Sequence, residues 1–486
     1  GIDLGTTNSV ASYWDGNKTN FIKNNDSLIF PSNIEFTKKG KLICQNHNSN
    51  QIRNIKRLIG RNTNDLELLK LLTDINYPTK IKNNQVFLFN QFEKKKYSLE
   101  ELNSLILNKI ISNAEIQLNR KIKDVVISIP SHFNQYQRES VLISSRLSKL
   151  NCIRIINEPT AAALAYGLNI HNDINILVFD LGGGTFDLSV LNIDNGMFDV
   201  LGTYGNNNLG GEDFTKSIIQ YIFNEFKNIN PTIDINDSIL KNNKDILRKE
   251  VERIKIHFSN DTMDIPLKID NFYNDKENNI SLDLYILLKF KIISNLYKKL
   301  LEQIKEYIDS VLIISNLEKE DIDYIVLVGG ATKMRCIKFL IESYFNKEPI
   351  CNINPDLVVS IGAGIQGYII NNPDDTFCQD ITLIDAVPLS IGIDSDNGIM
   401  TKIIPKGTKI PVKKYKLFTT EENEQNDVDI KIYQGERELV ENNYLLGSFN
   451  LNNLSKLEQG KCIIKVEISI NVNGIINIKA YEKGKG

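Results

Sequence analysis

Cysteine and histidine are scarce in this 486-residue chain, and this limits the kinds of site that it can form. The cysteines are Cys44, Cys152, Cys336, Cys351, Cys378 and Cys462. They include no Cys-x-x-Cys pair, and the four histidines are isolated from one another. This spacing argues against a zinc site and a disulfide framework, and it favours reduced thiols.

Strong net charge and long apolar runs are missing as well. The formal net charge is −3 with 24% charged residues, so the chain lacks the basic surface expected for binding nucleic acid or an anionic membrane. No apolar run reaches the roughly 18 residues of a transmembrane helix. The first residue is not methionine, so we expect a fragment, and an upstream targeting peptide remains an open question. The length predicts two or more domains.

Glycine turns between apolar runs are plentiful. Residues 180–187 (Asp-Leu-Gly-Gly-Gly-Thr-Phe-Asp) join two such runs, which predicts a strand, a turn and a second strand. Three consecutive glycines let backbone N–H groups approach an anion, and the flanking aspartates suit a hydrated Mg²⁺ beside phosphates. The structural alternative is a hairpin whose glycines only supply positive φ.

The same pattern recurs along the chain. Residues 1–10 again contain an aspartate, a glycine and paired threonines, and further glycine turns occur at Gly210-Gly211 and Gly329-Gly330. Two facing hairpins of this kind would form a clamp around a nucleotide. The repetition therefore favours phosphate binding over a purely structural role.

The order of these motifs resembles the seventy-kilodalton heat-shock chaperone family. Further matching motifs are residues 56–61, 127–130, 157–163, 354–356 and 362–364. The resemblance covers nearly the whole chain and implies an α/β actin-like (ribonuclease-H-like) ATPase of two lobes, followed by an all-β sandwich that binds peptides. We expect the nucleotide-binding domain at residues 1–377, a linker at 378–388 and the sandwich at 389–486, without the family's helical lid.

The resemblance assigns roles to particular residues. Those implied in catalysis are Lys56, Glu158, Asp180, Thr185 and Asp187. Those implied in nucleotide binding are Gly5, Thr6, Thr7, Asn8, Gly182, Gly183, Gly184, Gly210, Gly211, Glu212, Glu252, Lys255, Ser259, Gly329, Gly330, Lys333 and Asp356. Asp3, Asp180 and Asp187 are expected to hold Mg²⁺ through water.

Simpler readings of single residues stay open at this point. Lys56 would otherwise belong to a surface basic patch, and Glu158 would be a carboxylate at a helix start. Lys333 replaces an arginine that packs against adenine in the family, and lysine has no planar guanidinium to stack. We therefore expect weaker nucleotide binding than in typical relatives.

Five residues are implied in coupling the domains: Pro130, Arg138, Leu383, Ile384 and Asp385. Without the resemblance, Pro130 would be a strand terminator and Arg138 an exposed arginine. Residues 380–385 place apolar side chains between two aspartates, which is typical of the family's linker. A plain edge strand is the alternative.

After Pro388 the hydrophobic period becomes two, and Asn473-Gly474 separates two alternating runs, which predicts a hairpin. The expected peptide groove contains Ile393, Asp396, Phe418, Glu421, Val428 and Ile430. Asp396 and Glu421 replace apolar residues of an arch over the peptide, so we expect clients with a basic residue beside a short apolar stretch. In the alternative, both carboxylates point to solvent or the groove has degraded.

The chain is predicted to be an ATP-dependent chaperone that binds ATP or ADP with Mg²⁺. K⁺ is a further candidate ion. The segment between Gly40 and Lys56, residues 418–420 and residues 434–440 favour the bacterial iron–sulfur assembly branch (HscA-like), with a general folding chaperone (DnaK-like) as the alternative. The implied partners are a client polypeptide such as an iron–sulfur scaffold protein, a J-domain co-chaperone and a nucleotide exchange factor. We expect a monomer in a bacterial cytosol or an organelle of bacterial origin. A sugar kinase or a filament protein on the same fold is disfavoured because neither has the linker and the sandwich.

Overall fold

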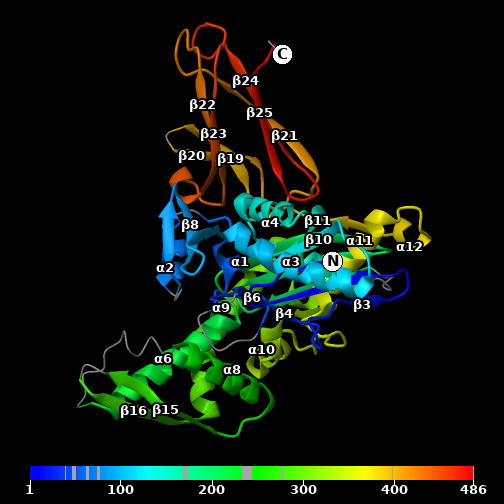
Figure 1. The fold of residues 1–486 in the computed structure, drawn as a ribbon. Helices are drawn as coiled ribbons and strands as arrows, with labels where there is room; N and C mark the ends of the chain where they lie inside the picture. Colours follow the sequence, from blue (N-terminus) through cyan, green and yellow to red (C-terminus); the bar gives the residue numbers. More distant parts are fainter. Residues whose placement is uncertain are drawn as a thin grey trace.

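The structure is a computed structural model, and it describes residues 1–38, 40–45, 51–61, 65–73, 77–167, 173–231, 244–275, 278–396 and 398–484. An α/β body forms the larger part, and the last strands of the chain extend from one end of it (Figure 1). The body contains two mixed sheets, each with its own hydrophobic core.

The first sheet has the order β11-β10-β1-β2-β3, with β4 also paired to β2. Its strands are β1 (Ile2–Asp3), β2 (Asn8–Trp14), β3 (Thr19–Phe21), β4 (Phe30–Pro31), β10 (Asp124–Ile129) and β11 (Asn151–Asn157). Strand β1 is parallel to β10 and antiparallel to β2. Helix α3 (Leu99–Leu118) begins with a capping box between Ser98 and Glu101, which satisfies backbone N–H groups at its start.

The second sheet has the order β17-β12-β13-β14-β18. Its strands are β12 (Ile174–Leu181), β13 (Phe186–Asp194), β14 (Met197–Asn206), β17 (Tyr324–Val328) and β18 (Thr382–Ile384). Strands β12 and β13 pair so that Asp180 lies opposite Asp187, which confirms the predicted strand, turn and strand around the three glycines. The mixed sheets of this body are consistent with the expected actin-like lobes.

Helices cover the sheets of both lobes. They are α1 (Ile55–Leu58), α2 (Leu66–Thr73), α4 (Gln135–Leu147), α5 (Glu158–Gly167), α6 (Gly211–Ile229), α8 (Lys244–Asn260), α9 (Phe290–Ser315), α10 (Arg335–Phe345), α11 (Val358–Asn371) and α12 (Thr376–Gln379). Smaller sheets are β5 (Ile34–Thr37) with β6 (Gly40–Ile43), β7 (Thr79–Lys82) with β8 (Gln85–Asn90) and β9 (Lys95–Ser98), and β15 (Ile265–Asp275) with β16 (Ile280–Leu288).

Helix α11 begins at Val358, two residues after Asp356, and contacts strands β2 and β10 of the first lobe. It packs on α5, and Gly362 allows this approach because a Cβ there would collide with the carbonyl of Ala161. The close contact joins the last helix of the body to the segment that carries Glu158.

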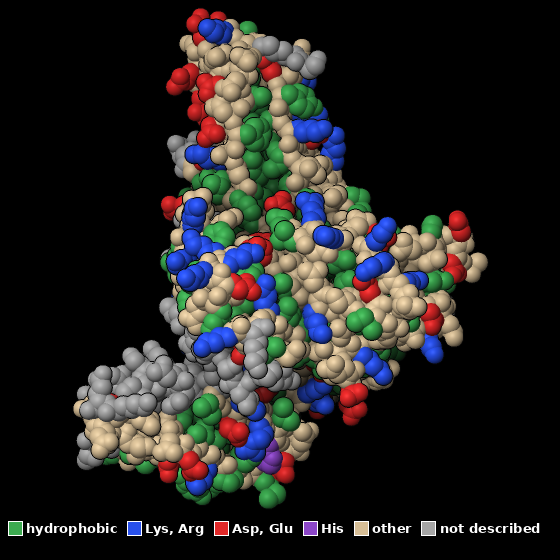
Figure 2. All heavy atoms as spheres, in the orientation of Figure 1, with side chains coloured by type: hydrophobic (Ala, Val, Ile, Leu, Met, Phe, Trp, Pro, Cys, Tyr) green, Lys and Arg blue, Asp and Glu red, His purple; other side chains and the backbone are tan. Residues whose placement is uncertain are grey.

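The C-terminal β region, residues 389–484, contains a four-stranded and a three-stranded sheet. The first consists of β19 (Ile391–Asp396), β20 (Ile399–Ile404), β22 (Val428–Gln434) and β23 (Tyr444–Leu451), and the second of β21 (Val412–Thr419), β24 (Ile463–Ile470) and β25 (Ile476–Glu482). Both sheets contribute to one hydrophobic cluster. Figure 2 shows a strip of hydrophobic side chains along this region. The turn at Asn473-Gly474 joins β24 to β25 as predicted.

The part of the chain that the structure describes has no helix long and apolar enough to cross a membrane.

Candidate functional site

Most of the residues predicted to bind nucleotide line one cavity of about 400 Å³ between the two lobes. They come from the first hairpin, α1, α5, the β12–β13 turn, the start of α6, α8 and the segments after β17. The predicted residues that line it are Asp3, Gly5, Thr6, Thr7, Asn8, Lys56, Glu158, Asp180, Gly182, Gly183, Thr185, Gly211, Glu212, Glu252, Lys255, Ser259, Gly329, Gly330, Lys333 and Asp356. Gly184, Gly210 and Asp187 lie outside this lining.

A buried group of charges forms the base of the cavity. The Lys56 ammonium makes an ion pair with the Glu158 carboxylate, and both side chains are more than nine-tenths buried. Burial raises the pKa of Glu158 to about 7, while the nearby Lys56 charge opposes this shift. Burial also raises the pKa of Asp3 and of Asp180, and for Asp180 the Glu158 charge adds to the effect. The single positive charge of Lys56 therefore faces the three carboxyl groups of Glu158, Asp3 and Asp180.

This excess of buried carboxylates fits a divalent cation, because a bound cation would offset both their loss of solvation, which is the main cause of the raised pKa values, and their mutual repulsion. Among the described residues, no group of three or more His, Cys, Asp or Glu side chains is arranged to hold a metal ion directly. A cation held through water and phosphate oxygens, with Asp3 and Asp180 as outer ligands, agrees with both observations.

Backbone packing brings the glycine turns into contact. The Gly211 N–H donates to the Gly182 carbonyl at 2.9 Å, so the start of α6 is fixed against the β12–β13 turn. Gly183 faces Thr7 of the first hairpin, and a Cβ at Gly183 would collide with the Thr7 hydroxyl. Gly329 adopts φ +82°, a left-handed conformation that favours glycine. These turns bring backbone into the cavity wall, where the N–H groups of Gly182 and Gly329 already donate to the carbonyls of Thr185 and Pro355, both at 3.0 Å.

The opposite end of the cavity is lined by α8 and by the segment after β17. The Lys255 ammonium contacts the Glu252 carboxylate at 2.8 Å and donates to the Gly211 carbonyl at 3.1 Å. The Lys333 ammonium pairs with Asp356. The predicted face of Glu252, Lys255 and Ser259 therefore points into the cavity, and both lysines already have acidic partners.

Several residues at the cavity were not predicted. Arg57 is buried and bridges the lobes, because its Nε donates to the Gly184 carbonyl at 2.7 Å and its Nη2 contacts Asp213 at 2.7 Å. Arg57 follows Lys56 in the sequence, so the motif itself was the available signal. Asn260 also lines the cavity, next to Ser259. Nothing in the helical spacing of α8 distinguishes Asn260 from a surface residue.

Asp187 lies behind the cavity and is 1% exposed. Its Oδ1 accepts a hydrogen bond from the Ser131 hydroxyl at 2.6 Å and lies 3.1 Å from Nδ1 of His132. Its Oδ2 is buried without a hydrogen-bond partner among the described residues, and so is Nε2 of His132. Asp187 thus contacts the segment after Pro130, which belongs to the first lobe.

The residues predicted to couple the domains meet at the base of the C-terminal β region. Arg138 is 5% exposed and donates to the Ser131 carbonyl at 3.2 Å and to Asn157 Oδ1 at 3.1 Å, so it is not an exposed surface arginine. Asp385 Oδ1 accepts hydrogen bonds from Asn157 at 3.0 Å and from Thr160 at 2.8 Å. The expected linker forms β18, an edge strand parallel to β14 that pairs Leu383 with Phe198.

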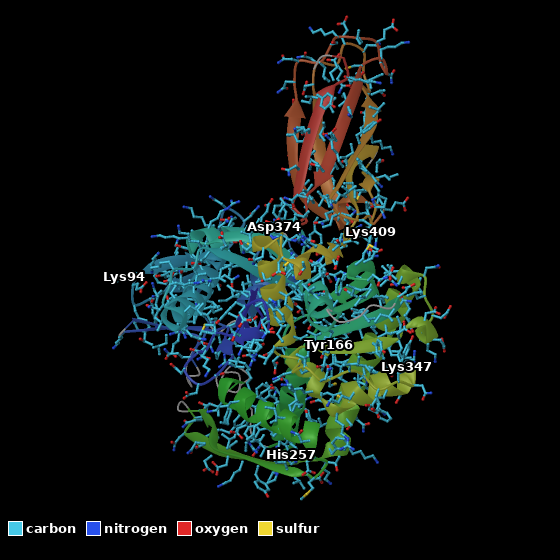
Figure 3. The ribbon with its side chains drawn as sticks, turned by 90° about the vertical axis from the view of Figure 1, so that its right-hand side faces the viewer. Lys94, Tyr166, His257, Lys347, Asp374 and Lys409 are labelled. Atoms are coloured by element: carbon cyan, nitrogen blue, oxygen red, sulfur yellow. The ribbon has the colours of Figure 1, made fainter. Side chains whose placement is uncertain are left out.

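Further contacts join the C-terminal β region to the body. The Gln135 N–H donates to Gln434 Oε1 at 3.1 Å, and the Ile155 N–H donates to Asn473 Oδ1 at 3.1 Å. Lys409 pairs with Asp199 of β14, and Figure 3 places Lys409 where the two parts meet. These contacts could not be predicted from the sequence, because each joins segments more than 200 residues apart.

The expected groove residues lie at different depths in the C-terminal β region. Ile393 and Ile430 are buried in its hydrophobic cluster, and Phe418 and Val428 pack partly buried against it. Glu421 is exposed, and its N–H donates to Gln425. The side chain of Asp396 lies outside the described residues, so the expected pair of facing carboxylates remains a prediction.

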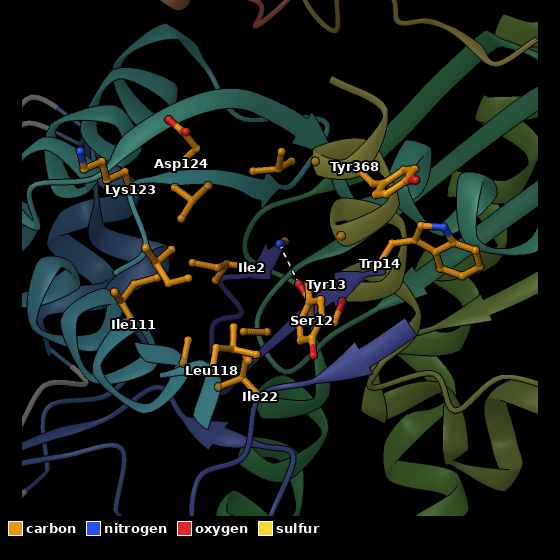
Figure 4. A pocket seen from close by; sticks show the side chains of 18 of the residues that line it. Ile2, Ser12, Tyr13, Trp14, Ile22, Ile111, Leu118, Lys123, Asp124 and Tyr368 are labelled. Carbon is orange, nitrogen blue, oxygen red and sulfur yellow. Dashed lines mark hydrogen bonds between the residues drawn. The ribbon is translucent and has the colours of Figure 1, made fainter. Parts of the chain in front are cut away.

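A second cavity, of about 570 Å³, lies beside Gly1. Ile2, Ile22, Ile111 and Leu118 border it together with β10 and α11 (Figure 4). It contains none of the residues predicted to bind nucleotide, whereas most of them line the cavity between the lobes, which is therefore the candidate site.

A comparison of the chain with protein-family models gives a match over residues 1–486 to the model described as Hsp70 protein.

Proposed function

Because the chain belongs to the Hsp70 family, we propose that ATP hydrolysis between its lobes controls how the C-terminal β region holds an extended client peptide. Members of this family are ATP-dependent chaperones. In general they bind ATP or ADP with Mg²⁺, client peptides, J-domain co-chaperones and exchange factors. An ATPase activity of this kind is expected here. The observation that carries the proposal is the convergence of so many predicted nucleotide residues on one cavity.

Different residues of the cavity would bind the nucleotide and hydrolyse it. Backbone N–H groups of Gly183 and Gly330 would hold the phosphates, since those of Gly182 and Gly329 already donate to the carbonyls of Thr185 and Pro355. Glu252, Lys255 and Ser259 would contact the ribose and the adenine. Lys56, fixed by Glu158, would place its positive charge against the transferring phosphoryl group and orient the attacking water. Bound Mg²⁺ would neutralise phosphate charge.

The C-terminal β region would be a β-sandwich domain that binds peptides, with the domain boundaries at residues 377 and 389. Two sheets that share one hydrophobic cluster support this assignment. An extended peptide would bind by main-chain hydrogen bonds, with a side-chain pocket over Ile393, Phe418, Val428 and Ile430. The contacts of β18 with β14 and of Asp385 with Asn157 support a role of the linker in coupling.

Within the family, we propose maturation of iron–sulfur proteins as the cellular role, with general protein folding as the alternative. The basis is sequence alone, namely the segment between Gly40 and Lys56 and residues 418–420 and 434–440. An ATPase stimulated by a purified iron–sulfur scaffold protein and not by unfolded model clients would support the specialised role. The reverse result would favour the general one.

ATP turnover by the purified chain tests the function as a whole. We expect hydrolysis without any sugar, stimulation by a client peptide, and no rise in light scattering with ATP. Gly183→Ala is the matched control without nucleotide binding, since its methyl group would collide with Thr7. Phosphorylation of a sugar or ATP-driven assembly would contradict the proposal.

A further inference from the structure

Ser131 lies between the candidate catalytic centre and the interface of the body with the C-terminal β region. Its hydroxyl donates to Asp187 Oδ1 at 2.6 Å, and its carbonyl accepts from Arg138 Nη2 at 3.2 Å. Ser131 is 1% exposed, so no solvent competes for either hydrogen bond. The residue lies in the turn between β10 and α4 and belongs to the first lobe, whereas Asp187 lies on β13 of the second.

Away from Asp187, a series of hydrogen bonds connects Ser131 to the linker. Arg138 Nη2 also donates to Asn157 Oδ1 at 3.1 Å, and the amide of Asn157 donates to Asp385 Oδ1 at 3.0 Å. All these side chains are more than nine-tenths buried. Burial lowers the pKa of Arg138 to about 10, while the charges of Asp385 and of Asp187 oppose this shift. Arg138 thus interacts electrostatically with the carboxylates at both ends.

Asp187 itself is held at one oxygen only. Ser131 and the ring of His132 both approach Oδ1, while Oδ2 is buried without a hydrogen-bond partner among the described residues. A carboxylate fixed in this way has a defined direction for its second oxygen. Asp187 also lies close enough to Glu158 and Asp180 for its charge to contribute to their raised pKa values.

We infer that Ser131 is a positioning residue: its hydroxyl orients Asp187 according to whether the linker holds Asn157 and Arg138 in place. The inference rests on the proposed function, and it adds Ser131 and its hydrogen bond to Asp187 to the residues that the resemblance already implies in coupling the domains. When β18 leaves β14 and Asp385 moves, the Asn157 amide loses its acceptor, so Arg138 keeps the Phe133 carbonyl as a partner of its Nε but has a less fixed partner in Asn157 Oδ1. The Ser131 carbonyl is then less constrained, and the orientation of Asp187 changes with it.

The test is a double-mutant cycle on the full chain, with Ser131→Ala, Asp385→Ala and the double variant. The readouts are the rate of hydrolysis of prebound ATP in a single turnover and the Kd for ATP. We expect Ser131→Ala to change the rate about tenfold or more, since small misplacements near reacting groups have effects of this size, while Kd changes less than about twofold. Asp385→Ala should alter the rate in the wild type and have little further effect in Ser131→Ala.

Two controls separate positioning from general damage. Ser131→Thr keeps the hydroxyl and should restore the wild-type rate. Ser144→Ala removes another fully buried hydroxyl, which bonds to the Ser140 carbonyl far from any catalytic group, and should hydrolyse ATP like the wild type.

Additive effects of Ser131→Ala and Asp385→Ala would overturn the inference, and so would a wild-type rate in Ser131→Ala. A Ser131→Thr variant as slow as Ser131→Ala would also overturn it. Failure of the proposed function is distinguishable from these outcomes, because the wild-type chain itself would then hydrolyse no ATP.

Discussion

At the scale of single residues, the Lys56–Glu158 pair is where we expect a substitution to reduce the rate of ATP hydrolysis most. Both side chains are buried at the base of the cavity, and the glycine turns lie elsewhere in its wall. Binding and hydrolysis should therefore be separable by substitution.

Lys56→Ala is expected to keep ATP binding and to reduce the rate of hydrolysis by about a hundredfold or more. Removing one preorganised charge from a reacting phosphoryl group typically has an effect of this size. Single-turnover hydrolysis and ATP binding on the same preparation measure the two properties. Lys298→Ala, on the exposed side of α9, is the matched lysine control. Hydrolysis at the wild-type rate in Lys56→Ala would contradict the role of this residue.

Lys333→Arg is expected to tighten nucleotide binding by about twofold to fivefold. A guanidinium can stack on the adenine ring, whereas an ammonium paired with Asp356 offers no planar surface. Titration with a fluorescent ATP analogue measures the change in Kd. Lys338→Arg, the same substitution on the exposed surface of α10, should leave Kd unchanged. Equal affinities in wild type and Lys333→Arg would show that this position does not reach the adenine.

The raised pKa of Glu158 predicts a pH dependence of stability. Because this pKa is about 7 in the folded chain against an ordinary 4.5, the folded state binds more protons than the unfolded state between these pH values. The free energy of unfolding must therefore fall as pH rises through this interval, by up to about 3 kcal/mol from this group. In the absence of nucleotide, we expect Tm to fall more between pH 5 and pH 7 in the wild type than in Glu158→Gln. Parallel Tm profiles would exclude this contribution.

At the scale of elements, the hydrophobic pattern predicted the strands well. Strands β12 and β13 flank the glycine turn as expected, and β24 and β25 flank the predicted turn at Asn473-Gly474. Such strands are determined by local periodicity and by the residues that end them, both of which are visible in the sequence. The position of Asp187 behind the cavity was not visible, because Ser131 and His132, its partners, lie 56 and 55 residues away.

The burial of Arg138 illustrates the same limit. Its hydrogen-bond partners come from the β10–α4 turn and from β11, and the Gly474 turn of the C-terminal β region lies against its guanidinium. Helical spacing describes one element at a time, so contacts from three separate segments cannot be read from it. The family resemblance was the signal that identified this residue.

For the linker, replacing both Leu383 and Ile384 with Asp should leave basal ATPase activity and abolish stimulation by peptide. Leu383 packs against the core of the body, and a carboxylate at this position would lose that contact and oppose pairing with β14. Steady-state ATPase rates with and without a saturating peptide measure the effect. Thr382→Asp, on the same strand but exposed, is the matched control. Stimulation that persists in the double variant would show that β18 connects the two parts of the chain without coupling them.

At the scale of the whole molecule, the C-terminal β region should select clients by charge as well as by hydrophobicity. If Asp396 and Glu421 both face the peptide, an apolar stretch beside Lys or Arg should bind better than the same stretch alone. A peptide array read at low and at high salt tests this, because the attraction is screened by ions. The combined variant Asp396→Met and Glu421→Ala should lose the preference. Equal binding of both kinds of peptide to the wild type would exclude charge selection.

The pairing of the short strand β18 with β14 can be followed by amide exchange, and it reports whether the linker is bound to the body. Only three residues pair with β14, and the Thr382 N–H donates to the Gly196 carbonyl at 3.0 Å. Each departure of the strand exposes that amide to water, so its hydrogen–deuterium exchange records how often the linker is released. The deuterium uptake of a peptide spanning residues 380–385 would thus report, without a mutation or an attached fluorophore, the effect of any ligand on the balance between the two arrangements.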